Sequence, residues 1–257
     1  AGGVDSTAVI LGDYSNGNDG VVLKGAGKKL VDIKGQSVNL VELSVSHYLL
    51  ARGLASVGLK ESDVKVVNTS DADIVAAYAT PDVTATVTWK PLLSEVLASK
   101  GSSLVFDSSK TPGEILDLMV VNTKVLKEHP ELGKALVGAW YEIMVLMQAK
   151  DEAATAALTS MAKASVTDLA GFNEQLATTN MYWQAGGAAA AITSPDLLAK
   201  MDLVRSFAFE KGVLGAGAKT ADAVGIEFPG GKTLGNPQAV TMRFDASYMQ
   251  LAAEGKL

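Results

Sequence analysis

Apolar residues in the first half of the chain fall into short runs that alternate with segments of helical periodicity. Runs rich in Val, Ile, Leu and Thr predict strands, and apolar positions three and four residues apart predict helices. Strands that alternate with helices at this spacing predict an α/β fold with crossover units on a largely parallel sheet. The expected strands are 7–11, 21–24, 37–41, 64–67, 83–89, 103–106 and 115–121, and the expected helices are 45–57, 72–78 and 91–99.

The second half is dominated by helical patterns. Large apolar side chains between residues 131 and 150 share one helical face, which predicts a long amphipathic helix with Trp140 in the core. Residues 151–163 are rich in alanine, the strongest helix former. Further helices are expected at 167–177, 195–211 and 246–254 and a last strand at 240–244, with glycine-rich breaks at 186–187, 215–217 and 230–231.

Composition narrows the class of protein. The 257 residues suffice for one large or two small domains with a substantial core, and 48% of them are hydrophobic. A net charge of −6 and the lack of a basic run count against nucleic acid or an anionic membrane as partner. The chain has no cysteine, which excludes disulfides and thiolate metal sites. A chain without cysteine suits an oxidising compartment, although cytosolic proteins can also lack cysteine.

A polar loop at residues 14–20 is the first candidate binding feature. It holds two Gly and two Asn, residue types that build tight irregular loops. An ordinary hairpin turn is the alternative, since Asn-Gly is a strong hairpin signal. The length of the loop favours a binding role, in which Tyr14 and Asn16 line a pocket and Asp19 pairs with a cationic group of a ligand.

The second candidate is the helix start at Ser44-Val45-Ser46-His47-Tyr48. Free N–H groups, the helix dipole and the hydroxyls of Ser44 and Ser46 suit a carboxylate or sulfonate. Capping by Ser44 alone is the commoner role for such a serine. His47 is a further candidate contact, although a lone histidine is more often structural, and His129 is expected to be exposed at another helix start.

Several residues are expected at the carboxyl ends of strands, where α/β sheets bind ligands. Trp89 ends one expected strand and Asp107-Ser108-Ser109 closes another, with core packing and a simple turn as the respective alternatives. Trp183 lies near a glycine-rich break and offers a face for a cation. The sequence contains no Walker pattern, nucleophile elbow, zinc motif or calcium loop, so neither catalysis nor a cofactor is predicted.

Four segments together resemble the nitrate/taurine-type solute-binding proteins of ABC transporters, in the branch of urea- or amino-acid-type binding proteins. They are Gly-Asp-Tyr-Ser-Asn-Gly-Asn-Asp-Gly (12–20), Ser-Val-Ser-His-Tyr-Leu-Leu (44–50), Thr-Val-Thr-Trp-Lys-Pro (86–91) and Leu-Met-Val-Val-Asn (118–122). The resemblance implies the type 2 periplasmic-binding-protein fold, with two α/β lobes and a ligand between them. Residues 1–24 would belong to lobe 1, residues 25–114 to lobe 2, and residues 115–257 to the remainder of lobe 1 with the C-terminal helices.

The resemblance also implies a periplasmic receptor that closes on a small zwitterion or anion and docks on an ABC permease. Ligand contacts would come from the loop around Tyr14–Asp19 and from Ser44, Ser46, Tyr48, Trp89 and Ser108. The acid group would sit at the Ser44–Ser46 helix start and the ammonium group at Asp19, Trp89 or Trp183. A small amino-carboxylate such as 4-aminobutyrate, or its sulfonate analogue taurine, is the expected ligand.

The chain departs from this family at its beginning. It starts at Ala1-Gly2-Gly3 without Met or a basic leader, so a processed or cut chain is expected. Members of the family open with further strand–helix–strand units of lobe 1, which would amount to roughly 60–80 residues. The first lobe is therefore expected to be incomplete unless another segment supplies the missing strands.

Two other function classes use related folds. The effector domain of a transcription regulator would carry a helix-turn-helix and a dimer surface, and neither is visible in the sequence. An enzyme of thiamine-pyrimidine synthesis would need a histidine- and cysteine-rich site, whereas this chain has two histidines and no cysteine.

Overall fold

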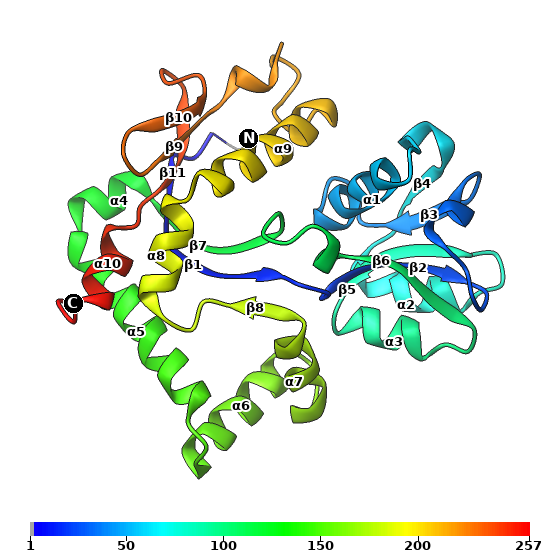
Figure 1. Ribbon diagram of the computed structural model, residues 1–257, viewed down its shortest axis with the longest axis horizontal. Coiled ribbons are helices and arrows are strands. Elements are labelled where there is room, and N and C mark those ends of the chain that lie inside the picture. Colours follow the sequence, from blue (N-terminus) through cyan, green and yellow to red (C-terminus); the bar gives the residue numbers. More distant parts are fainter. Residues whose placement is uncertain (1–2) are drawn as a thin grey trace. The chain divides into compact units, whose positions relative to one another are not determined.

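The computed structural model describes residues 3–257 and divides into two compact units (Figure 1). Unit 1 consists of Ala1–Tyr14, Leu116–Phe172 and Met181–Leu257, and unit 2 consists of Ser15–Ile115 and Asn173–Asn180. The chain passes between the units four times: within strand β1 (Ser6–Ser15), just before strand β7 (Leu116–Asn122), within helix α7 (Leu169–Ala177) and within strand β8 (Thr179–Met181). Each unit is built around its own sheet.

Unit 2 is an α/β layer structure whose five-stranded sheet has the order β4-β3-β5-β2-β6. Helix α1 packs against β2, β5 and β6, while α2 and α3 pack against each other and against β5. Figure 1 shows α1 on one side of this sheet and the other two helices on the opposite side. The elements are β2 (Asp19–Lys24), β3 (Ser37–Leu40), α1 (Val45–Ser56), β4 (Lys65–Asn68), α2 (Asp71–Ala79), β5 (Ala85–Trp89), α3 (Leu92–Ala98) and β6 (Ser102–Asp107), with 3-10 turns η1 (Leu30–Ile33), η2 (Glu61–Asp63) and η3 (Ser108–Lys110).

Burial along β2 explains why helices cover both faces of this sheet. Val21, Val22 and Leu23 follow one another and are all fully buried. Successive side chains of a strand point to opposite faces, so three consecutive apolar residues can all be buried only if each face is covered. This continuous apolar pattern fits an interior strand, and β2 lies between β5 and the edge strand β6.

Unit 1 contains a second sheet, of order β10-β9-β11-β1-β7, with β8 also paired to β1. Its core centres on Ala8, Val9, Ile10 and Leu11 of β1, which are buried. The other strands are β9 (Gly225–Phe228), β10 (Lys232–Gly235) and β11 (Val240–Phe244), together with β8, of which only Met181 lies in unit 1. The helices are α4 (Thr123–Glu128), α5 (Pro130–Gln148), α6 (Glu152–Ala164), α8 (Ala185–Thr193), α9 (Pro195–Glu210) and α10 (Ser247–Ala253), with the 3-10 turn η4 (Ala221–Ala223). Helix α7 begins in unit 1 and ends in unit 2. None of the helices described combines the length and apolar character needed to cross a bilayer.

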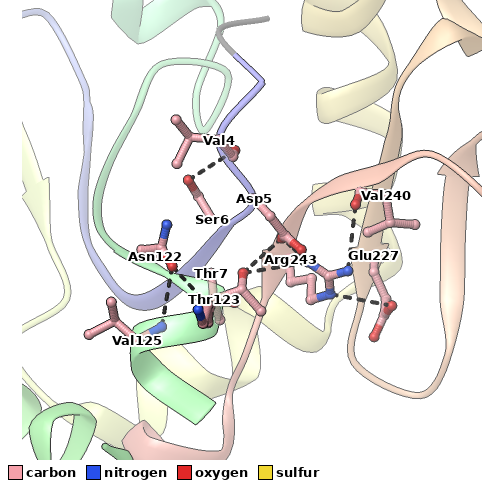
Figure 2. A network of polar contacts seen from close by, with 11 residues as sticks. Val4, Asp5, Ser6, Thr7, Asn122, Thr123, Val125, Glu227, Val240 and Arg243 are labelled. Atoms are coloured by element: carbon pink, nitrogen blue, oxygen red, sulfur yellow. Dashed lines mark hydrogen bonds and ion pairs between the residues drawn. The ribbon is translucent and has the colours of Figure 1, made fainter. Parts of the chain in front are cut away.

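A polar network joins three segments of unit 1 that are distant in sequence (Figure 2). Arg243 on β11 donates to the carboxylate of Asp5, which also accepts a hydrogen bond of 2.8 Å from Thr123 Oγ1. The hydroxyls of Thr123 and Thr7 lie 2.9 Å apart. The guanidinium of Arg243 also approaches Glu227 on β9, at 3.8 Å. These contacts tie the start of β1 to the end of β7 and to β11.

Three sequence expectations need correction. Both sheets are mixed rather than largely parallel, because β2 runs antiparallel to β5 and β6, and β1 runs antiparallel to β7. Residues 15–24 and 173–180, both expected in lobe 1, lie in unit 2. For the first of these segments the reason is that β2 hydrogen-bonds within the unit 2 sheet. Gly186 and Gly187 do not interrupt the chain but lie inside α8, where the alanines that follow supply strong helix propensity.

Candidate functional site

The loop between β1 and β2 is held by a buried cluster of hydroxyls in unit 2. Ser15 Oγ donates to Asp19 Oδ2 at 2.5 Å and lies 2.6 Å from Ser108 Oγ. Because Ser15 gives its only proton to Asp19, the Ser108 hydroxyl must be the donor to Ser15. Ser108 Oγ in turn accepts the N–H of Gly17 at 2.8 Å. The carboxylate of Asp19 and the hydroxyl of Ser108 therefore serve the loop itself.

This loop is not a hairpin turn, since its two strands belong to different sheets. Gly17 has φ of 108°, a conformation that favours glycine. Asn16 is exposed, and its N–H donates to Thr178 O at 2.9 Å. Asn18 Oδ1 accepts from Thr178 Oγ1 at 3.3 Å, so residues 16–18 are fixed on the outside as well.

The amino end of α1 carries the second candidate cluster. Ser44 is the N-cap, and its Oγ accepts the N–H of Ser46 at 3.1 Å while donating to Val41 O at 2.7 Å. The N–H groups of Ser44 and Val45 make no hydrogen bond to any residue the structure describes. Ser46 is 0% exposed, and its Oγ has no partner within residues 3–257. Helix N-terminal N–H groups of this kind attract anions.

His47 is part of the same turn but faces the protein. Its ring is buried, with Nδ1 accepting the N–H of Leu43 at 3.2 Å and Nε2 lying 3.0 Å from Glu61 Oε2. Leu43 has φ of 62°, the left-handed region that side chains other than glycine rarely adopt. His47 therefore contacts the turn in front of the helix, and the structure does not present its ring to solvent.

Tyr48 takes part in a buried ionic cluster. Its hydroxyl donates to Glu114 Oε2 at 2.6 Å, and Arg52 binds both oxygens of the same carboxylate, at 2.7 and 3.0 Å. Burial, followed by the contact with Glu114, raises the pKa of the Tyr48 phenol far above its usual range. This cluster fixes the side of α1 against the segment that leads into β7.

Trp89 ends β5 and is the cross-strand partner of Asp19 on β2. Its side chain is half-buried, which leaves part of the ring accessible. The preceding residue, Thr88, is buried, and its Oγ1 has no hydrogen-bond partner in the described part of the chain. Trp89 therefore combines exposure with a fixed backbone position beside the β1–β2 loop.

The remaining two candidates, Tyr14 and Trp183, belong to unit 1. Tyr14 packs edge-on against Tyr182, with ring centroids 6.2 Å apart and an interplanar angle of 61°. The Tyr182 N–H donates to Gly12 O at 2.9 Å, which holds the segment after β8 beside β1. Trp183 follows Tyr182 and is half-buried.

Unit 1 also holds a pair of carboxyls that the sequence patterns did not reveal. Asp13 on β1 pairs directly with Asp117 on β7, and Asp13 Oδ1 is buried without a partner among the described residues. Burial, with a smaller effect from Asp117, raises the pKa of Asp13 from 3.8 to about 8. Trp140 packs against the core of unit 1, as expected. It also lines a hollow of about 250 Å³ with Gly12 and Asp117, and its indole nitrogen is buried without a partner in the described structure.

Within unit 2 the structure brings the predicted residues into two groups, of which the first contains Asp19, Trp89 and Ser108 and the second contains Ser44, Ser46 and His47. Sequence patterns missed Ser15, Leu43 and Glu114, which hold these groups in place. No group of three or more His, Asp or Glu side chains in residues 3–257 is arranged to bind a metal ion.

Comparison with known proteins identifies the lineage. The model of the NMT1/THI5-like family matches residues 16–154. The taurine-binding periplasmic protein of Escherichia coli is 26% identical over 129 residues, which cover 49% of this chain and 40% of that protein. The match thus spans about two fifths of this curated relative.

Two solved structures share the fold at low sequence identity. The periplasmic aliphatic sulphonate binding protein of Escherichia coli has a TM-score of 0.69 and 18% identity, over 85% of this chain and 72% of that one. The desulfurization enzyme DSZB has a TM-score of 0.57 and 15% identity, over 81% and 73% of the two chains. The fold expectation is confirmed as the two-unit α/β fold of type 2 periplasmic binding proteins. The model of the NMT1/THI5-like family matches more than half of the residues of this chain, so the chain belongs to that family.

Proposed function

We propose that this chain is the solute-binding component of an ABC importer and that it holds the acid group of a small ligand at the amino end of α1. The observation that carries the proposal is the set of unsatisfied polar groups there: two N–H groups without partners among the described residues and, in the same first turn of the helix, the buried Ser46 hydroxyl. A buried hydroxyl without a partner is costly, so its retention is best explained by a ligand atom that completes it.

The chemistry of the helix start favours a compact acid. The aligned peptide dipoles place about half a positive charge at this end, and the free N–H groups point outward. A carboxylate or sulfonate supplies several acceptor oxygens to N–H groups and hydroxyls at once. Ser44 is occupied as the cap, so Ser46 is the hydroxyl left for the ligand.

The names of similar proteins support a small acid as ligand, and the contacts of Asp19 bear on where its ammonium group would bind. The matched curated relative is named for taurine and a structural neighbour for aliphatic sulphonates. We include taurine and 4-aminobutyrate, because each carries an acid and an ammonium group. Asp19 is 4% exposed and accepts the Ser15 hydroxyl, so we assign the ammonium group to the accessible face of Trp89, with Trp183 as a further candidate.

The proposal places the protein outside the cytoplasmic membrane with a permease as partner, and it includes no chemical step. Domain closure on the ligand, which the resemblance implies, remains a prediction. One structural neighbour is a desulfurization enzyme, so a turnover assay belongs to the test. No described residue cluster favours the regulator or the thiamine-pyrimidine enzyme as an alternative.

Isothermal titration calorimetry against taurine, alkanesulfonates, nitrate and 4-aminobutyrate tests the proposal. Loss of a hydrogen bond to a charged group costs about 1.5–3 kcal/mol, so Ser46→Ala should weaken binding roughly 10- to 100-fold. Ser56→Ala is the matched control, because Ser56 bonds Gly53 O at the other end of the same helix. Equal dissociation constants for both variants, or product formation from the ligand, would contradict the proposal.

A further inference from the structure

Leu43 has a backbone conformation that its own side chain does not explain. Its φ is 62°, and its side chain is 55% exposed, so burial of that side chain does not compensate for the unfavourable backbone. A leucine stays in the left-handed region only where other contacts hold it there. Leu43 lies immediately before the N-cap of α1, so its conformation sets the direction in which the chain enters the helix.

The contact that holds Leu43 comes from His47. The Leu43 N–H donates to His47 Nδ1 at 3.2 Å, so this nitrogen carries no proton. The proton of the neutral ring is then on Nε2, which donates to Glu61 Oε2 at 3.0 Å. Glu61 belongs to η2, so the ring is fixed from a second element of unit 2.

Neighbouring N–H groups of the turn also donate hydrogen bonds to side chains. Glu42 N–H donates to Asn68 Oδ1 at 3.0 Å, and Ser46 N–H donates to Ser44 Oγ at 3.1 Å. With Leu43 N–H bound to His47, only the N–H groups of Ser44 and Val45 between them lack a partner in the described chain. Side chains therefore select which backbone donors stay available.

We propose that His47 is a positioning residue: its Nδ1 holds Leu43 in the left-handed conformation and so presents the Ser44 and Val45 N–H groups to an acid. The expected effect of His47 on ligand affinity rests on the proposed function. Its effect on the backbone conformation of Leu43 does not depend on a ligand. His47 does not touch the ligand in this scheme. A purely structural histidine would fill space and hold Glu61 without affecting the turn.

Two conservative variants separate these roles. The amide oxygen of asparagine falls near the place of Nδ1, whereas the amide of glutamine falls near Nε2. With taurine as the probe, His47→Asn should keep the dissociation constant within about twofold of the wild type, while His47→Gln and His47→Ala should weaken binding about tenfold. Equal affinities for the asparagine and glutamine variants would overturn the inference.

A second measurement does not need a ligand. Amide hydrogen exchange and the HN–Hα coupling of Leu43 should match the wild type in His47→Asn and change in His47→Gln and His47→Ala. In a Leu43→Gly background the same substitutions should have little effect on binding, because glycine adopts positive φ without strain. If the wild type binds no taurine, the proposed function fails with this probe. If the amide hydrogen-exchange rate of Leu43 is unchanged in His47→Ala, the positioning role of His47 is refuted, whatever the ligand result.

Discussion

Ser108→Ala is the substitution that tests how the β1–β2 loop is held. Ser108 is 0% exposed, and its hydroxyl makes three contacts: one to Ser15 Oγ and one each from the N–H groups of Gly17 and Asp19. Alanine has nearly the same volume and leaves the strand–turn geometry unchanged. The substitution therefore removes hydrogen bonds without creating a cavity.

The magnitude follows from what is left unpaired. The Gly17 N–H, at 2.8 Å from Ser108 Oγ, loses its acceptor inside the protein, whereas Ser15 still donates to Asp19 at 2.5 Å. Each neutral hydrogen bond is worth about 1 kcal/mol, and a buried donor without a partner costs about 1–3 kcal/mol. The longer contact from Asp19, at 3.4 Å, adds little. We therefore expect a loss of about 2 kcal/mol in the free energy of unfolding.

Thermal unfolding followed by circular dichroism measures this loss. For a chain of this size, 2 kcal/mol corresponds to a fall in Tm of roughly 4–8 °C. Ser109→Ala is the matched control, because Ser109 is the exposed neighbour and its hydroxyl makes no hydrogen bond to a described residue. A Ser108→Ala protein that unfolds at the same temperature as Ser109→Ala would refute the view that Ser108 organises the loop.

Three further predictions concern stability. The pKa of Asp13 is raised from 3.8 to about 8, so between these pH values the folded state retains a proton that the unfolded state releases. The free energy of unfolding should therefore fall as pH rises through this range, by at most about 1.4 kcal/mol per pH unit. Urea unfolding at pH 5 to 8 should show this slope for the wild type and a flatter one for Asp13→Asn; identical slopes would contradict the assignment. Tyr48→Phe removes the 2.6 Å bond to Glu114 and should lower the free energy of unfolding by about 1.5 kcal/mol, a claim that an unchanged urea midpoint would refute. Leu23→Ala, at a fully buried position of β2, should cost about 2–5 kcal/mol in the same assay, and a loss below 1 kcal/mol would argue against its place in the core.

Local patterns predicted most elements because each depends on neighbouring residues. The apolar run at Val21–Leu23 and the helical face around Trp140 can be read directly from the chain. The direction of β2 could not be predicted in this way, because its partners β5 and β6 lie far along the chain. Helix α8 was not predicted, because Gly186 and Gly187 favour a break in the chain whereas the alanines after them favour a helix.

The candidate site was predictable only in part. The residue type and spacing of Ser44 and Ser46 predict a helix start at this position. The partners that occupy Tyr48 and Ser108 come from residues 66 and 93 positions away, and no local signal marks them. Leu43 is hidden for another reason: leucine is a poor candidate for positive φ, and only the bond to His47 reveals why it adopts this conformation.

Amide chemical-shift mapping of the isotopically labelled protein during titration with taurine tests the central claim most directly. We predict that the largest shifts fall on the N–H groups of Ser44, Val45 and Ser46, and that Ser46→Ala weakens the titration while Ser56→Ala does not. Shifts confined to other parts of the chain, with the amino end of α1 unchanged at saturation, would contradict the account.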